Sequence, residues 1–259
     1  MTKKSPAGTQ SILRAIRVMK TVAQRKEIGW RLTDLAAHCD LGKATAYRIV
    51  ACLTSTRIVL QRAGDRRYVP GPLLFELALS TPAYSSFAAA VHEDLTRMAE
   101  IGGNAFLYLR SGDEVVCIDR AGTTSMQPVT AIGRRRPIAQ STFGISILLA
   151  LPMHEQHALL GTRKQRTRGT DSRVLAYRKI LERSRSYGFG INRGDVVPGL
   201  TSIAIPILDS QQRPFAAIGV TGPSASLRGE RLRGVVQLLQ REVRRIEREH
   251  AQLIAEISH

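Results

Sequence analysis

The sequence has few cysteines, the residues that cross-link small secreted domains and bind structural metal ions. Its three cysteines, Cys39, Cys52 and Cys117, are odd in number and show no CxxC spacing, so they indicate neither a disulfide framework nor a zinc site. No apolar run approaches the length that spans a membrane. The N-terminal residues MTKKSPAGTQ lack the apolar core of a signal peptide. We therefore expect a cytoplasmic protein with reduced cysteines, preceded by a disordered lead-in over residues 1–9.

The usual catalytic patterns are also missing. Ser141, Ser202 and Asp195 supply polar groups, but there is no GxSxG elbow, paired carboxylate or phosphate-binding loop. His154 and His157 in HEQH are three residues apart, without the HExxH spacing or an evident third ligand, which is typical of a solvated helix face. We expect no catalytic residue, no bound metal and no cofactor.

Acidic residues are scarce. The chain of 259 residues has 21 Asp and Glu against 38 Lys and Arg, a net charge of +17. Residues 1–80 hold 14 basic and 5 acidic residues, whereas the remaining 179 hold 24 and 16. The excess is densest near the N-terminus, which favours a polyanionic partner there, although a basic surface alone is not specific to nucleic acid. Aromatic residues, at 5%, are too few for a surface on which single strands stack.

Two short helical patterns meet within the basic segment, in LTDLAAHCDLGKATAYRIVACL, residues 32–53. Apolar residues recur at helical spacing in both patterns: Leu32, Leu35 and Ala36 in the first, and Ala46, Ile49, Val50 and Leu53 in the second. Asp40 and Gly42 between them fit a tight turn. This is the organisation of a helix-turn-helix, whose second helix presents its N-terminal side chains to the major groove of DNA. An ordinary pair of packed helices gives the same pattern, so the stretch alone leaves both open.

The flanking segments favour the DNA-binding interpretation. Residues 10–26 predict an amphipathic helix with its apolar stripe at Ile12, Ala15, Ile16, Met19, Val22 and Ala23. After the second helix, the runs IVLQ and RRYV flank Ala63-Gly64-Asp65, a hairpin turn signal. Three helices followed by a basic hairpin are the order of a winged helix-turn-helix.

The candidate DNA contacts are polar positions off the apolar stripe. On the second helix they are Lys43, Ala44, Thr45, Tyr47 and Arg48, and at the tip of the hairpin they are Arg62, Arg66 and Arg67. Arg48 is the best base reader because its guanidinium can bind O6 and N7 of guanine together. Lys43, at the helix start, is better placed for a phosphate. The alternative is a solvated polar face.

The second part of the chain has a different organisation. Residues 73–101 read as helix interrupted at Thr81-Pro82, which we interpret as a linker. Strands and helices then alternate irregularly: a hairpin around Ser111-Gly112-Asp113, a strand in SMQPVTAIG, helices near 144–151, 153–161 and 171–187, strands in TSIAIPILDS and PFAAIGVTGP, and a charged helix over 227–257. This order predicts a mixed sheet flanked by helices, of the α/β or α+β class.

Taken together, these segments resemble the IclR family of bacterial transcriptional regulators over almost the whole chain. SILRAIRVMKTVA, LTDLAAHCDLGKATAYRIVACL and GDRRYVPGPLLFELA resemble its first helix, helix-turn-helix and wing. IGRRRPIAQSTFGISILLALP and YGFGINRGDVVPGLTSIAIPILDSQQRPFAAIGVTGP resemble its ligand-domain segments. The resemblance implies a winged helix-turn-helix domain over 10–71, a linker helix over 72–90 and a GAF-like α/β effector-binding domain over 91–259. It also implies a dimer or tetramer on a near-palindromic operator in double-stranded DNA, with a small organic acid as effector.

Matching positions to the family pattern gives the candidate pocket: Ser141, Thr142, Gly144, Asn192, Ser202, Gly219 and Thr221. Small hydroxyl and glycine positions let N–H and O–H groups approach a carboxylate closely, although turn and strand chemistry would use the same residues. Of the adjacent Arg134, Arg135 and Arg136, not all can face one pocket.

Some positions depart from the family pattern. Ala44 stands where a serine is frequent, Thr142 where an alanine is common, and Asp195 where a glutamate is common. Ile145 replaces a common lysine, which favours a more apolar pocket and hence an aromatic or longer acid.

The sequence thus predicts a DNA-binding transcription regulator controlled by a small organic acid. The alternative is an enzyme or small-molecule carrier whose basic N-terminal domain binds RNA or an acidic protein. The sequence contains a recognition helix and a wing and lacks an aromatic RNA-binding platform, which favours the regulator.

Overall fold

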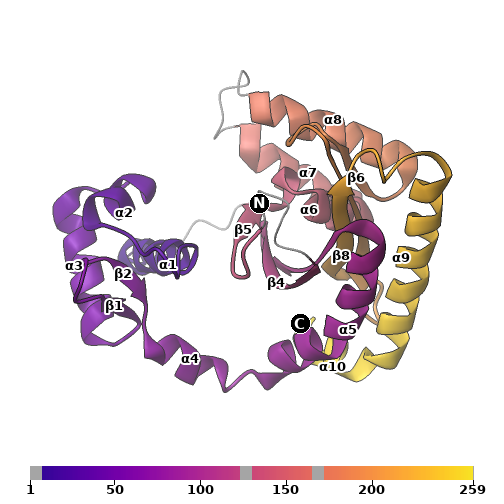
Figure 1. Ribbon diagram of the computed structural model, residues 1–259. Coiled ribbons are helices and arrows are strands. Elements are labelled where there is room, and N and C mark those ends of the chain that lie inside the picture. Colours follow the sequence, from indigo (N-terminus) through magenta and orange to yellow (C-terminus); the bar gives the residue numbers. More distant parts are fainter. Residues whose placement is uncertain (1–7, 123–129, 165–171, 259) are drawn as a thin grey trace. The chain divides into compact units, whose positions relative to one another are not determined.

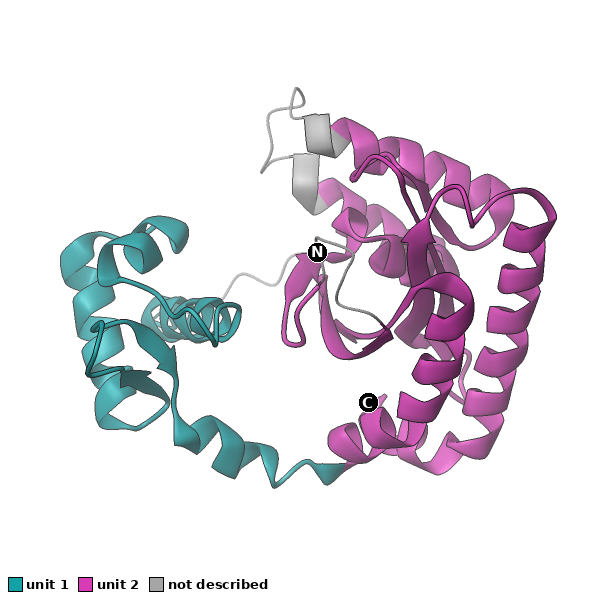
Figure 2. Ribbon diagram, in the orientation of Figure 1, with its two compact units in different colours: residues 1–82 teal, residues 83–259 magenta. Residues whose placement is uncertain are grey.

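The computed structural model describes residues 8–122, 130–164 and 172–258 (Figure 1). The chain divides into two compact units, residues 1–82 and 83–259 (Figure 2). The division falls at Pro82, within the stretch expected to be a linker helix. That stretch is two helices, α4 (Pro72–Ala78) and the first part of α5 (Pro82–Gly102). Proline has no N–H and disfavours a helical residue before it, so the helix is interrupted there.

The N-terminal unit contains a three-helix core and a two-stranded hairpin. Its elements are α1 (Gln10–Ala23), α2 (Leu32–His38), α3 (Lys43–Ser55), β1 (Val59–Gln61) and β2 (Tyr68–Pro70), followed by α4. The strands β1 and β2 pair antiparallel around the expected turn. Buried residues from all three helices and from the hairpin share one hydrophobic cluster, which includes Val18, Leu35, Val50 and Val59. The winged helix-turn-helix arrangement is therefore confirmed.

The apolar stripe predicted for α1 is only partly correct. Val18, Thr21 and Val22 are buried, but Ile12 is 58% exposed and Ile16 is 38% exposed. The C-terminal half of α1 packs against the other elements of its unit, whereas none of the described elements of that unit buries the first turns. Apolar spacing alone does not show how far along a helix its covering partner reaches.

In the turn between α2 and α3, the residue with a left-handed backbone conformation is Asp40 and not Gly42. Asp40 has φ of 53°, in the left-handed region, whereas Gly42 has an extended conformation just before α3, with φ of −62°. Aspartate is among the few residues other than glycine that enter the left-handed region readily, so it can end a helix in this way.

The C-terminal unit is built on one sheet of six strands within the described residues, in the order β5-β4-β3-β8-β7-β6. The strands are β3 (Asn104–Ser111), β4 (Glu114–Gly122), β5 (Arg135–Pro137), β6 (Gly190–Arg193), β7 (Leu200–Leu208) and β8 (Pro214–Pro223). Every neighbouring pair is antiparallel, so the mixed sheet we expected is wrong and the unit is α+β. Most of the strand expected in SMQPVTAIG falls on residues 123–129, outside the described residues. The sequence did not predict β6.

Helices cover both faces of this sheet (Figure 1). The helices after β4 are η1 (Ile138–Gln140), α6 (Thr142–Ala150), α7 (Met153–Lys164), α8 (Ser172–Tyr187), α9 (Gly229–Glu249) and α10 (Ala251–Ile257). α5, α9 and α10 pack on one face, in a cluster that includes Phe87, Leu95 and Leu239. α6 packs on the other face, and α8 packs against α6. The charged C-terminal helix that we expected is divided at His250. The predicted fold class, a helix-turn-helix unit followed by a unit of helices and strands, is confirmed.

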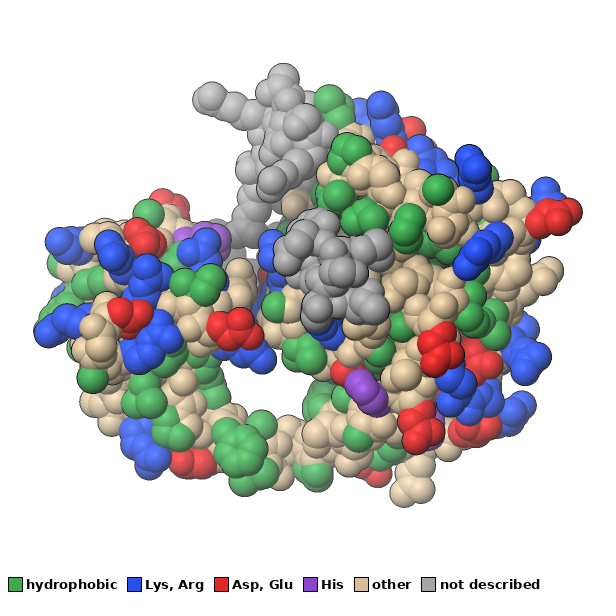
Figure 3. All heavy atoms as spheres, in the orientation of Figure 1, with side chains coloured by type: hydrophobic (Ala, Val, Ile, Leu, Met, Phe, Trp, Pro, Cys, Tyr) green, Lys and Arg blue, Asp and Glu red, His purple; other side chains and the backbone are tan. Residues whose placement is uncertain are grey.

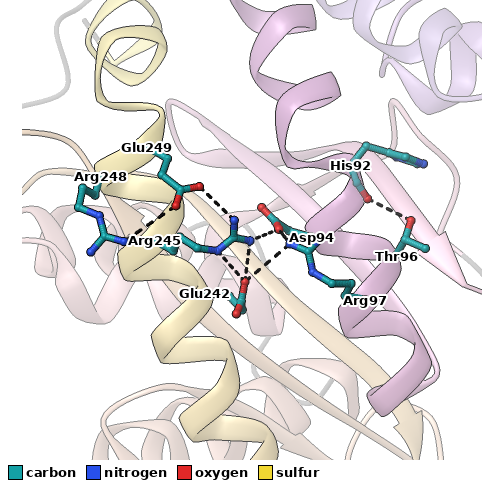
Figure 4. A network of polar contacts seen from close by, with 8 residues as sticks. All are labelled: His92, Asp94, Thr96, Arg97, Glu242, Arg245, Arg248 and Glu249. Carbon is teal, nitrogen blue, oxygen red and sulfur yellow. Dashed lines mark hydrogen bonds and ion pairs between the residues drawn. The ribbon is translucent and has the colours of Figure 1, made fainter.

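A polar network joins α5 to α9 (Figure 4). Asp94, whose side chain is 4% exposed, accepts hydrogen bonds from Arg97 and Arg245. Arg245 also pairs with Glu242 at 2.7 Å and with Glu249 at 3.0 Å. These carboxylates raise the pKa of Arg245 above its ordinary value, chiefly through the hydrogen bond to Glu242. We call these residues the Asp94 network.

Candidate functional sites

The N-terminal end of α3 is exposed where the sequence predicted DNA contacts. Lys43, Ala44, Tyr47 and Arg48 are exposed, and the Tyr47 side chain is 59% exposed although it is aromatic. Thr45 is half-buried. Ala46, Val50 and Leu53 are buried, so the opposite face of the helix is held by the core. Figure 3 shows Lys and Arg side chains spread over the visible face of the N-terminal unit. This helix therefore presents mixed polar and cationic groups from a rigid support.

The wing does not present all three predicted arginines equally. Arg62 donates hydrogen bonds to the carbonyl oxygens of Glu27 and Ile28, at 2.8 and 2.7 Å. It also pairs with Asp65 at 2.7 Å, and its hydrogen bond holds the pKa of that carboxyl below its ordinary value. Arg62 thus ties the wing to the segment between α1 and α2.

Arg67 is partly engaged within the same unit. Its guanidinium donates to the carbonyl oxygen of Gly29 at 3.4 Å and lies 3.6 Å from the Asp65 carboxylate. In the part of the chain that the structure describes, the Arg66 side chain is exposed and makes no hydrogen bond or ion pair. Arg66 is therefore the wing arginine best placed for an external phosphate. Sequence reasoning missed this difference because the two carbonyl oxygens that Arg62 binds lie more than thirty residues earlier.

Five of the seven predicted pocket residues line one cavity of about 110 Å³ in the C-terminal unit. They are Ser141, Thr142, Asn192, Ser202 and Thr221. Ser202 and Thr221 face each other on β7 and β8, with their hydroxyl oxygens 2.8 Å apart. Asn192 comes from the edge strand β6, opposite Ser202. The sheet register thus brings these three residues of the consecutive strands β6, β7 and β8 side by side in the cavity lining.

The two predicted glycines do not line the cavity. A side chain at Gly144 would meet the carbonyl oxygen of Ile138 at 2.1 Å, so this glycine lets α6 approach η1. A side chain at Gly219 would meet the carbonyl oxygen of Ile203 at 2.0 Å, so this glycine belongs to the β7–β8 packing. Both glycines allow the elements around the cavity to pack closely, but neither lines it.

The other wall is the start of α6. Ser141 and Thr142 are 5% and 7% exposed, and their hydroxyls have no hydrogen-bond partner among the described residues. The first backbone N–H groups of a helix also lack partners within the helix and carry partial positive charge. Buried hydroxyls and free N–H groups on one wall suit a ligand that brings hydrogen-bond acceptors.

Sequence reasoning missed the aromatic part of the cavity. Phe106 and Tyr108 on β3 line it together with Phe143, and the rings of Tyr108 and Phe143 stack with centroids 4.6 Å apart. Burial raises the pKa of Tyr108 to about 12, against the opposing effect of a hydrogen bond with Thr130. Strand alternation predicts that Phe106 and Tyr108 share a face, but only the tertiary fold shows that this face borders a cavity.

The segment after β6 is held beside the cavity by an ion pair. Asp195 accepts hydrogen bonds from Arg183 on α8 at 2.5 and 3.1 Å, and its own N–H donates to the side-chain oxygen of Asn192 at 2.9 Å. Partial burial opposes the charge of Asp195, but the contacts with Arg183 and the backbone hydrogen bonds, including that from the N–H of Arg193, together lower its pKa. Asp195 therefore positions the pocket wall that carries Val196 and Val197.

Ile145 does not contribute to the cavity as the sequence suggested. It is fully buried against Tyr177 and Ile180 and joins α6 to α8. The apolar character of the cavity comes instead from its aromatic residues and from Val196, Val197 and Leu200.

The described residues offer no group of three or more His, Cys, Asp and Glu side chains that could hold a metal ion. His154 and His157 are exposed on α7. Burial raises the pKa of the Cys117 thiol to about 12, so this thiol is not ionised near neutral pH. Within the same described ranges, no helix is long and apolar enough to cross a membrane.

Two family models match the chain. Residues 11–63 match the IclR helix-turn-helix domain, and residues 85–248 match the bacterial transcriptional regulator IclR C-terminal domain. The probable transcriptional regulator SauR from Cupriavidus necator is 29% identical over 213 residues, which are 79% of this chain and 83% of that protein. The HTH-type transcriptional regulator KdgR from Escherichia coli is 25% identical over 249 residues, 94% of this chain and 93% of that protein.

Solved structures show the same fold. A putative IclR regulator from a Silicibacter species has a TM-score of 0.73 at 22% identity, covering 93% of this chain and 96% of its own. An IclR homologue from Microbacterium hydrocarbonoxydans, solved as a complex with 4-hydroxybenzoate, has a TM-score of 0.65 at 21% identity and covers 92% and 97%. The exposed recognition helix and wing, with the family models matching both units, show that the chain belongs to the IclR family of DNA-binding transcriptional regulators.

Proposed function

We propose that this regulator responds to a small organic acid, with an aromatic acid preferred, bound in the cavity of the C-terminal unit. The observation that carries the proposal is the convergence of Ser141, Thr142, Asn192, Ser202 and Thr221 on one cavity from segments far apart in sequence. Aromatic rings border the same cavity. The complex of a structural relative with 4-hydroxybenzoate supports an aromatic acid.

On DNA, α3 enters the major groove of a near-palindromic operator. Arg48 reads a base, Lys43 binds a phosphate, and Ala44, Thr45 and Tyr47 complete the contact surface. Arg66 adds a phosphate contact from the wing. Two copies of the chain bring two recognition helices to half-sites one turn of DNA apart, so the active form is a dimer or tetramer. A regulator of bacterial genes works at the chromosome, and we place it in the cytoplasm without a catalytic role.

The effector controls DNA binding only if it binds one arrangement of the oligomer better than the other. The stretch 72–90 is the connection through which such a change reaches the recognition helices. It contains α4, in which Phe75 and Leu77 are 68% and 56% exposed, and Leu79 directly after this helix is 64% exposed.

A thermal-shift screen of aromatic and aliphatic carboxylates on the full chain tests this function. A binding acid should raise the Tm progressively as its concentration exceeds the dissociation constant. Ser202→Leu or Thr221→Leu fills the cavity and should abolish the shift while operator binding by the free protein remains. Retention of the shift in both variants would place the effector site elsewhere.

A further inference from the structure

The sheet register decides which of three consecutive arginines faces the cavity. Arg136 lies opposite Val115 on β4, and Arg135 lies opposite Val116. Val115 belongs to the buried cluster on the α6 face of the sheet. Because successive residues of a strand point to opposite faces, Arg136 shares that face and Arg135 does not. Arg136 accordingly lines the cavity, together with Phe106 and Tyr108.

The neighbouring arginines have other roles. Arg135 pairs with Glu114 at 2.9 Å and donates to the Ser111 hydroxyl at 2.7 Å. Arg134 is exposed and does not line the cavity. Arg136 is half-buried, and among the described residues no carboxylate lies within ion-pair distance of it.

The acidic groups on the adjacent elements already have partners. Glu114 binds Arg135, Asp119 on β4 binds His92 at 2.8 Å, and Glu155 on α7 binds Arg110 at 2.9 Å. A guanidinium that borders an aromatic cavity without a counter-charge among the described residues can bind an external anion. The two oxygens of a planar carboxylate match the paired N–H donors of a guanidinium.

We propose that Arg136 binds the carboxylate of the effector. This assignment rests on the proposed function and adds to it the residue that selects the charge. The ring lies beside Phe106, Tyr108 and Phe143, and the hydroxyls of Ser202 and Thr221 serve a polar group remote from the carboxylate.

Matched probes and matched variants separate charge selection from general pocket binding. The full chain is titrated with 4-hydroxybenzoate and with its neutral amide, 4-hydroxybenzamide, by calorimetry and thermal shift. Arg136→Gln and Arg136→Lys are compared with Arg134→Gln, which removes the same charge two residues away but outside the cavity. The Tm of each ligand-free variant and its operator binding establish that it is folded.

The wild type and Arg134→Gln should bind the acid and prefer it over the amide by about tenfold or more, as expected for a charge-assisted bidentate pair. Arg136→Gln should lose this preference, and Arg136→Lys should retain only part of it. Equal weakening by Arg134→Gln and Arg136→Gln would show a general field effect and overturn the assignment. Undiminished acid preference in Arg136→Gln would also overturn it while leaving the proposed effector function standing. If 4-hydroxybenzoate does not bind the wild type, the proposed aromatic acid and the assignment both fail.

Discussion

At the scale of single residues, the described structure separates arginines that the sequence treats alike. Arg48 is exposed on α3, where Ala46 and Val50 fix the helix from behind. Arg62 is engaged by two carbonyl oxygens and one carboxylate of its own unit. Arg136 borders the cavity. An arginine can bind an external partner only through guanidinium N–H groups that are not already engaged within the chain. The sequence does not show which arginines have such groups.

Arg48→Ala should weaken binding to the cognate operator by about 1–3 kcal/mol and relax the preference at one base position. The reason is the loss of a bidentate contact to a base edge. Titrations against a set of operators that differ at single positions measure both effects. Unchanged affinity and unchanged preference would remove Arg48 from the readers, and Lys43→Ala, which should weaken all sequences equally, is the matched control.

At the scale of elements, the wing and the α5–α9 contact show two uses of charge. In the wing, Arg62 holds the hairpin to the preceding segment and Arg66 is left for an external partner. In the C-terminal unit, the Asp94 network joins the helix that follows the linker to the long C-terminal helix (Figure 4). The first contact fixes the wing and leaves Arg66 exposed, and the second holds two packed helices together.

Arg66→Ala should flatten the slope of log affinity against log salt concentration by about 0.9, because one phosphate contact and its released counterion are lost. Arg62→Ala should leave the slope nearly unchanged and instead lower the Tm by a few degrees, because the hairpin loses its hydrogen bonds to Glu27 and Ile28. Filter-binding or fluorescence titrations at several salt concentrations distinguish the two. A reversed pattern would mean that Arg62 is released to contact DNA.

Asp94→Ala should destabilise the C-terminal unit by about 1–3 kcal/mol, less than for a fully buried ion pair because both arginine partners are partly exposed. Arg248→Ala is the comparison, since its side chain is 76% exposed and lies 3.9 Å from Glu249. It should change the free energy of unfolding by less than about 0.5 kcal/mol. Urea unfolding followed by circular dichroism compares the two, and equal effects would show that burial of Asp94 contributes nothing.

At the scale of the whole molecule, local signals were predictable from the sequence and distant pairings were not. The hairpin at Ser111-Gly112-Asp113 follows from turn chemistry, and the α3 stripe follows from helical spacing. The short strand β6 gave no such signal, because it has only four residues and begins with a glycine. The aromatic wall and Arg136 could not be placed, because their position depends on strands that are far apart in sequence.

The pairing of β3 with β8 has a consequence for synthesis of the chain. Asn104 lies beside Thr221, so more than a hundred residues must follow β3 before its second neighbour exists. A ribosome that adds about 5–20 residues per second needs on the order of ten seconds for this interval. During that time β3 can pair only with β4, and its other edge is open to the edges of neighbouring nascent chains. A chain that ends before Pro214 therefore lacks β8, and its sheet stays divided between β3 and β7.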